Sequence, residues 1–216
     1  MSSTLVSNIA ELVTNSNPDL GIINDAAFVI ENGKVVWVGS AKSAPATDSK
    51  IDARGGTVTP GFVDSHTHAV FAGDRSADYF ARMSGGSYSS GGINTTVQAT
   101  RNASVEELRT QTRHIVEQAR SSGTTTLEIK SGYGLDIATE KKILTVAREF
   151  TTETTFLGAH VVPKDAKSRD EYVNLVKGEM LDACVDLAKW IDVFCDSSAF
   201  TVDEARDILK AGMAKG

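Results

Sequence analysis

The sequence lacks the features of several large protein classes. It has only two cysteines in 216 residues, and no apolar run approaches the roughly 18 to 20 residues that span a bilayer. Its net charge is -6, which argues against a nucleic-acid surface, because such surfaces need clustered Lys and Arg. The first residues include Glu11 and no basic segment, so they predict no signal peptide.

Two kinds of catalytic motif are also missing. No GxxxxGK[ST] or GxGxxG segment opens a predicted helix, which disfavours nucleotide binding, and no GxSxG occurs, which disfavours elbow-type serine hydrolysis. Cys184 and Cys195 fall on different predicted elements, so buried reduced thiols are favoured over a disulfide. Hydrophobic residues make up 41% of the chain, as in folded globular proteins. We therefore expect a soluble, cytoplasmic protein.

Residues 1–58 predict a small β domain. The runs 27–30 and 35–38 are β-branched or aromatic, and they flank Asn32-Gly33. Asn-Gly between two such runs is typical of a hairpin turn, because both turn positions favour positive φ. A polar connector, 40–49, follows.

Residues 59–216 alternate between short apolar segments and amphipathic ones. Capping boxes at Ser104 and Thr201 and a cap at Asp136 predict helix starts, and a long helix is expected to include Tyr172 and Leu187. A Gly/Ser-rich loop is expected over residues 84–92. The predicted strands are 61–63, 124–129, 154–157 and 191–194.

Polar side chains follow several of these strands. Apolar strands alternating with helices predict a parallel α/β sheet, and an open doubly wound sheet and a closed (β/α)8 barrel both fit. His66, His68, Tyr133 and His160 all fall at or just after strand ends. In either architecture the carboxyl edge of the sheet is where function lies.

His66 and His68 predict part of a metal site. Residues i and i+2 of a strand point to the same side, so both imidazoles face one interior. Imidazole nitrogens suit Zn or Fe, and the setting after an apolar strand and Pro60-Gly61 favours ligands over packed histidines. Two ligands are fewer than the three protein ligands that catalytic zinc normally has.

The other polar candidates have alternatives that residue types leave open. Tyr133 lies between two glycines. It is either a site residue or an ordinary tyrosine in a surface turn. Lys130 is either a carbamylated metal bridge or, as we favour, the partner of a carboxylate. His160 is a third ligand, a proton donor or a buried histidine. Arg75 suits a bidentate carboxylate contact, or is a surface arginine.

Three motifs together resemble a known family. A β hairpin domain leading into Pro60-Gly-Phe-Val-Asp-Ser-His-Thr-His68 resembles the metal-dependent amidohydrolase superfamily. Within it, the runs 66–75, 128–135 (Glu-Ile-Lys-Ser-Gly-Tyr-Gly-Leu) and 156–160 (Phe-Leu-Gly-Ala-His) resemble the imidazolonepropionase family. The resemblance implies a (β/α)8 barrel preceded by a small β-sandwich domain, and hydrolysis of 4-imidazolone-5-propanoate to N-formimino-L-glutamate in histidine degradation.

The resemblance also implies a role for each matching residue. His66 and His68 match metal ligands to Zn or Fe, and Arg75 matches the residue that binds the substrate's propionate. Tyr133 matches a residue that contacts substrate and product. His160 matches a residue that binds the imidazolone ring, where it can stabilise charge as the tetrahedral centre forms. The implied partner is this small molecule, with no nucleic acid or membrane.

The length departs from the family's pattern. A (β/α)8 barrel takes about 250 residues, and only 158 lie from Thr59 to Gly216, so we expect four β/α units of an N-terminal fragment. Further metal ligands and a general base would lie outside it, and the chain alone would bind zinc weakly without turnover. Two alternatives are another cyclic amidohydrolase, such as a deaminase, and a non-catalytic half-barrel binding module. The choice of metal and a homodimer stay open.

Overall fold

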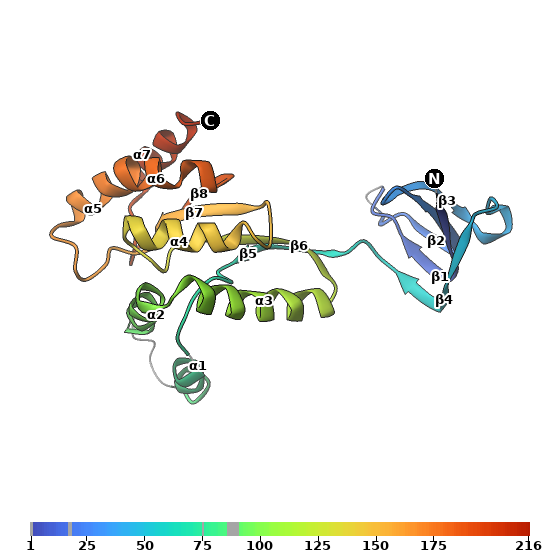
Figure 1. Ribbon diagram of the computed structural model, residues 1–216, viewed down its shortest axis with the longest axis horizontal. Helices are drawn as coiled ribbons and strands as arrows, with labels where there is room; N and C mark the ends of the chain where they lie inside the picture. Colours follow the sequence, from blue (N-terminus) through green and yellow to red (C-terminus); the bar gives the residue numbers. More distant parts are fainter. Residues whose placement is uncertain (1, 17–18, 75, 86–90) are drawn as a thin grey trace. The chain divides into compact units, whose positions relative to one another are not determined.

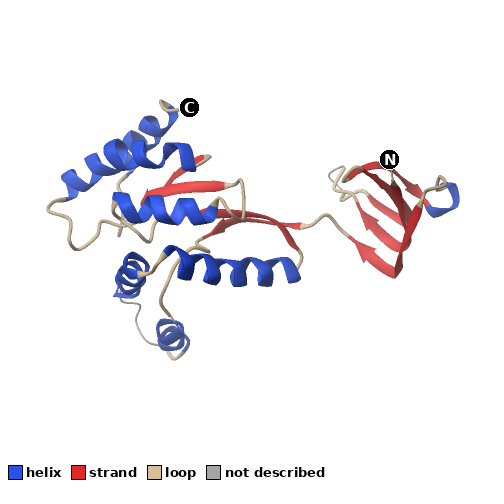
Figure 2. Cartoon of the chain, viewed as in Figure 1, coloured by secondary structure: helices blue, strands red, loops and turns tan. Residues whose placement is uncertain are grey.

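The computed structural model describes residues 2–16, 19–74, 76–85 and 91–216, in two compact units, Met1–Gly61 and Phe62–Gly216. Unit 1 is a four-stranded sheet (Figures 1 and 2). The order β3-β2-β1-β4 combines antiparallel β1–β2 and β2–β3 pairs with a parallel β1–β4 pair. The strands are β1 Ser3–Val13, β2 Ile22–Glu31, β3 Lys34–Ser40 and β4 Ser49–Val58, with a short 3-10 turn at Ala41–Ser43.

The expected hairpin is confirmed in unit 1. Asn32 and Gly33 have φ of 52° and 74°, and Glu31 pairs with Lys34 across the turn. Ile9 and Leu12 are buried on one face of the sheet, so apolar side chains of β1 form part of its core. The strands β1 and β4 were not predicted, and β1 carries a register irregularity between Val6 and Ile9.

Unit 2 contains a parallel sheet of four strands in the order β5-β6-β7-β8. All six residues of β7 are buried, which fits a central strand covered on both faces. Helices α3 (Val105–Ser121) and α4 (Ile137–Ala147) pack on β6, α4 and α6 (Leu181–Cys184) on β7, and α7 (Val202–Met213) on β8. The strands are β5 Phe62–Thr67, β6 Thr124–Lys130, β7 Thr154–Ala159 and β8 Trp190–Val193.

Three helices of unit 2 begin where the caps predict. Ser104 and Thr201 form complete capping boxes, and the Asp136 side chain accepts the Thr139 N–H. None of the described helices is long and apolar enough to cross a membrane. The helices are α1 Ser76–Met83, α2 Gly91–Asn102, α3 Val105–Ser121, α4 Ile137–Ala147, α5 Arg169–Leu175, α6 Leu181–Cys184 and α7 Val202–Met213, with a π turn at Val176–Met180 and a 3-10 turn at Val185–Leu187.

Two expectations about these helices need correction. The predicted long helix from Tyr172 to Leu187 is broken at Gly178, whose backbone (φ -116°, ψ -109°) is not helical, because glycine readily leaves the helical region. The expected loop over 84–92 is a turn at Ser84 and Gly85, whereas Gly91 and Gly92 begin α2. Its residues 86–90 lie outside the described residues.

Candidate functional site

The end of strand β5 places two histidines beside each other. His66 lies in β5 and His68 follows its last residue, Thr67. The Thr67 hydroxyl donates a 2.6 Å hydrogen bond to the Glu128 carbonyl, which fixes the end of β5 against β6. The two imidazole centroids are 5.5 Å apart, so the rings are neighbours at this edge of the sheet.

Two further predicted residues meet His68 at the same edge. The His160 ring, at the end of β7, stacks on His68 with centroids 4.8 Å apart and an angle of 11° between the planes. The Tyr133 ring, from the loop after β6, lies 4.9 Å from His68 and 5.3 Å from His160. The structure thus brings together four of the five predicted site residues. The fifth, Arg75, lies outside the described residues.

The environment of His68 keeps its ring neutral. Burial lowers the pKa of His68 to about 3, and the neighbouring His160 and His66 add to this effect. Among the buried side-chain polar atoms that the structure describes, His68 Nδ1 is the one without a hydrogen-bond partner. A buried nitrogen without a partner is costly unless a ligand binds it. A neutral imidazole with such a nitrogen therefore fits a metal ligand.

The number of possible ligands is small. The described residues contain no group of three or more His, Cys, Asp or Glu side chains able to hold a metal ion. His66 and His68 are side chains of the kind that Zn and Fe accept as ligands.

Lys130 lies on the same sheet, in the last position of β6, and forms ion pairs. Its Nζ lies 2.8 Å from Glu128 Oε1 and 3.0 Å from Asp192 Oδ2. Burial opposes the charged form, but the hydrogen bonds to both carboxylates outweigh it and raise the pKa of Lys130. The carboxylate-paired interpretation of Lys130 is therefore supported over a carbamylated bridge. Asp192, which the sequence interpretation missed, is the second partner.

The glycines around Tyr133 serve close packing. Gly132 has φ +112°, and a Cβ there would lie 2.9 Å from the Leu157 carbonyl oxygen and 3.0 Å from His160 Nδ1. A Cβ on Gly134 would lie 2.7 Å from the backbone nitrogen of Glu140. Because neither glycine has a Cβ, the loop packs closely enough for His160 Nδ1 to lie 2.9 Å from the Gly132 carbonyl oxygen. The loop and the His160 ring are therefore in direct contact.

A cleft opens beside the ring cluster. His68 and Tyr133 line it together with Phe71, Thr96 from α2 and Gln111 from α3. The Phe71 and Tyr133 rings meet edge to face with centroids 6.3 Å apart. A cleft with an apolar wall and convergent polar groups is typical of a small-molecule site.

The comparisons with known proteins agree with this geometry. Residues 50–133 match the model of the amidohydrolase family. The whole chain is 52% identical over 221 residues to the imidazolonepropionase of Mycolicibacterium smegmatis, and 54% identical over 221 residues to that of Streptomyces coelicolor. Each alignment covers 100% of this chain and 56% of the relative. The chain thus spans little more than half the length of these relatives.

A solved structure shows the same fold. The triazine hydrolase from Arthrobacter aurescens superposes with a TM-score of 0.59 over 100% of this chain and 51% of that protein, at 14% identity. At this identity the likeness concerns the fold alone. The expected amidohydrolase-type fold, with four β/α units of a barrel and a separate small sheet, is confirmed.

Proposed function

We propose that this chain, which is an amidohydrolase by fold and by sequence resemblance, forms part of an enzyme that hydrolyses 4-imidazolone-5-propanoate to N-formimino-L-glutamate. The observation that carries the proposal is the meeting of His66, His68, Tyr133 and His160 at one sheet edge, in a chain 52% identical to an imidazolonepropionase. Both cysteines are free thiols, which supports a reducing compartment such as the cytoplasm.

The two histidines at the end of β5 would hold the metal ion. The neutral His68 ring, with its buried and unpartnered Nδ1, and the adjacent His66 ring are suited to Zn or Fe. A metal ion bound there would act as a Lewis acid and activate water at neutral pH.

His160 would act on the substrate ring. A carbonyl oxygen can only accept, so His160 Nδ1 carries the proton that is donated to Gly132, and Nε2 is the nitrogen that would contact the substrate. Because Nδ1 keeps its proton, a second proton at Nε2 would make the ring an imidazolium, and this cation would stabilise negative charge that develops on the substrate ring.

Tyr133 and Arg75 would bind the rest of the substrate. The Tyr133 phenol lines the cleft beside His68 and can contact the substrate there. We propose that the Arg75 guanidinium binds the propionate through paired hydrogen bonds, which would fix the ring before the chemical step.

The metal assignment can be tested by zinc binding. In His68→Gln, zinc affinity measured by calorimetry should fall at least about 100-fold, since even loss of an outer partner of a ligand costs 10- to 100-fold. His114→Gln is the matched control. It makes the same substitution outside the site, because His114 is exposed on α3. Equal affinity in both variants would contradict the assignment.

The substrate assignment depends on Arg75. Arg75→Ala should raise the KM for 4-imidazolone-5-propanoate by at least about 10-fold, as expected for loss of a charge-assisted contact. Product formation can be followed by mass spectrometry. An unchanged KM would instead favour a hydrolase or deaminase for a neutral cyclic substrate.

A further inference from the structure

A buried acid holds the backbone of the loop that carries Tyr133. Glu140, in the first turn of α4, is 0% exposed. Its Oε1 accepts the N–H groups of Gly134 and Leu135, each at 2.8 Å, and its Oε2 accepts that of Gly132 at 3.0 Å. One carboxylate thus binds three N–H groups of a five-residue segment, Ser131–Leu135.

This segment has a backbone that needs such support. Gly132 has φ +112°, and Leu135 has φ +57°, a left-handed conformation that a non-glycine residue adopts at a cost. Strained conformations persist only where the surrounding structure fixes them. Hydrogen bonds to a buried carboxylate are strong enough to do so.

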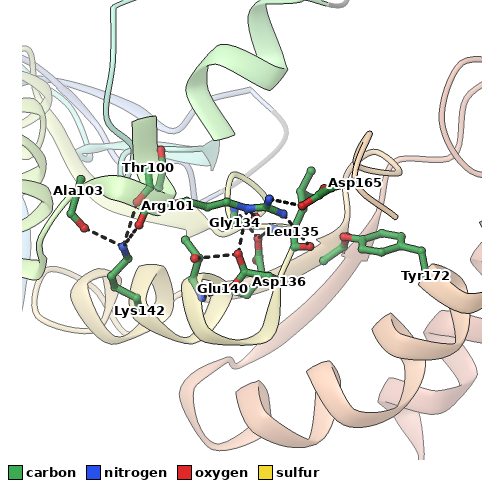
Figure 3. Close-up of polar contacts among 12 residues, drawn as sticks. Thr100, Arg101, Ala103, Gly134, Leu135, Asp136, Glu140, Lys142, Asp165 and Tyr172 are labelled. Atoms are coloured by element: carbon green, nitrogen blue, oxygen red, sulfur yellow. Dashed lines mark hydrogen bonds and ion pairs between the residues drawn. The ribbon is translucent and has the colours of Figure 1, made fainter. Parts of the chain in front are cut away.

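An arginine on another helix binds carbonyl groups of the same segment. Arg101, near the end of α2, donates from Nε to the Gly134 carbonyl at 2.7 Å and from Nη2 to the Leu135 carbonyl at 3.3 Å. It also pairs with Asp136 at 2.9 Å and with Asp165 at 2.7 Å. Figure 3 shows the loop between these partners. The N–H groups of the segment are therefore bound by the carboxylate of Glu140, and its carbonyl groups by the guanidinium of Arg101.

The held segment contacts the candidate site at two points. Tyr133 is its central residue, and the Gly132 carbonyl is the partner of His160 Nδ1 at 2.9 Å. A shift of this carbonyl would change both the orientation of the His160 ring and the nitrogen that carries its proton. The position of the loop is thus linked to the chemistry of His160.

We propose that Glu140 is a positioning residue, which with Arg101 fixes Ser131–Leu135 so that Tyr133 and His160 face His68 in a productive geometry. The catalytic part of this inference rests on the proposed function. Glutamine has the same shape as Glu140 but offers one acceptor oxygen, and its NH2 would face a backbone N–H. Glu140→Gln therefore removes the hydrogen bonds that one carboxylate oxygen accepts from the loop, without opening a cavity.

The experiment compares Glu140→Gln with Glu149→Gln in protein expressed from its own gene. Glu149 lies just beyond the other end of α4, where Arg109 binds its carboxylate with Nε at 2.6 Å and Nη2 at 2.8 Å. Both variants lose one paired carboxylate. Steady-state kinetics with 4-imidazolone-5-propanoate and ¹⁵N NMR of the His160 imidazole are measured at equal metal content.

Glu140→Gln should lower kcat about 10- to 100-fold, as small misplacements near a reacting group do, and change KM much less. Its His160 signal should lose the protonated-Nδ1 form. Glu149→Gln should keep kcat within about 2-fold and leave the signal unchanged. If Glu140→Gln does not fold, Arg101→Gln is measured in the same way and should show the same pattern.

The outcomes separate this inference from the proposed function. A Glu140→Gln protein with wild-type kcat and an unchanged His160 signal would overturn the positioning role, as would an unaffected Arg101→Gln protein. If the wild type hydrolyses no 4-imidazolone-5-propanoate but the His160 signal still shifts in Glu140→Gln, the positioning stands and the proposed function fails.

Discussion

Replacing Gly132 with alanine tests how closely the loop packs on His160. The new Cβ would lie 2.9 Å from the Leu157 carbonyl oxygen and 3.0 Å from His160 Nδ1, closer than ordinary contacts. The backbone at φ +112° adds about 1–3 kcal/mol of strain for a residue with a side chain, and overpacking adds about 1–3 kcal/mol. The free energy of unfolding should therefore fall by about 2–6 kcal/mol.

Gly123→Ala is the matched control for this change. Gly123 has a similar φ of +94°, but its Cβ would meet only the Phe62 ring at 3.3 Å, and Phe62 is 62% exposed and free to move. Its cost should be limited to the same backbone strain, about 1–3 kcal/mol. Urea unfolding followed by circular dichroism measures both variants. Equal losses, within about 0.5 kcal/mol, would refute the argument from close packing.

Three further predictions concern stability in unit 2. Ser104→Ala removes the capping box of α3 and should cost about 1 kcal/mol in urea unfolding; no loss would contradict the cap. Hydrogen bonding to Arg169 lowers the pKa of Glu204 to about 2, so its stabilisation is complete above the ordinary value of 4.5 and disappears as pH falls toward 2. Glu204→Gln should therefore cost about 1 kcal/mol at pH 7, after solvent screening, and nothing near pH 2; a loss independent of pH would exclude the ion pair. Tyr172→Phe deletes a 2.8 Å hydrogen bond to the buried Gly158 carbonyl and should lower the free energy of unfolding by about 1–3 kcal/mol, whereas an unchanged value would show that the bond contributes nothing.

Local features of the fold could be predicted from the sequence. Asn32-Gly33 and the caps at Ser104, Asp136 and Thr201 act within a few residues, so the hairpin and three helix starts follow from short-range chemistry. The meeting of His68, Tyr133 and His160 also follows, since the carboxyl ends of parallel strands lie at one edge.

Other features depend on contacts between distant residues. Strand β4 has many polar residues, and it is a strand because it pairs with β1 about 45 residues earlier. Glu140 was missed because its position in α4 reads as an ordinary helix residue. The signal that could have identified it is an acid six residues after Gly134, in a helix whose start adjoins the glycine-rich loop. The role of Arg75 stays a prediction.

The most direct test concerns the claim that His66 and His68 form the metal-binding part of a hydrolytic site. Protein expressed from its own gene is stripped with a chelator and then supplied with Zn²⁺, and N-formimino-L-glutamate is measured by mass spectrometry with 4-imidazolone-5-propanoate as substrate. We predict that product formation stops on stripping, returns with Zn²⁺ and is absent in His68→Gln. Product formation that is unaffected by stripping, or that persists in His68→Gln, would contradict the claim.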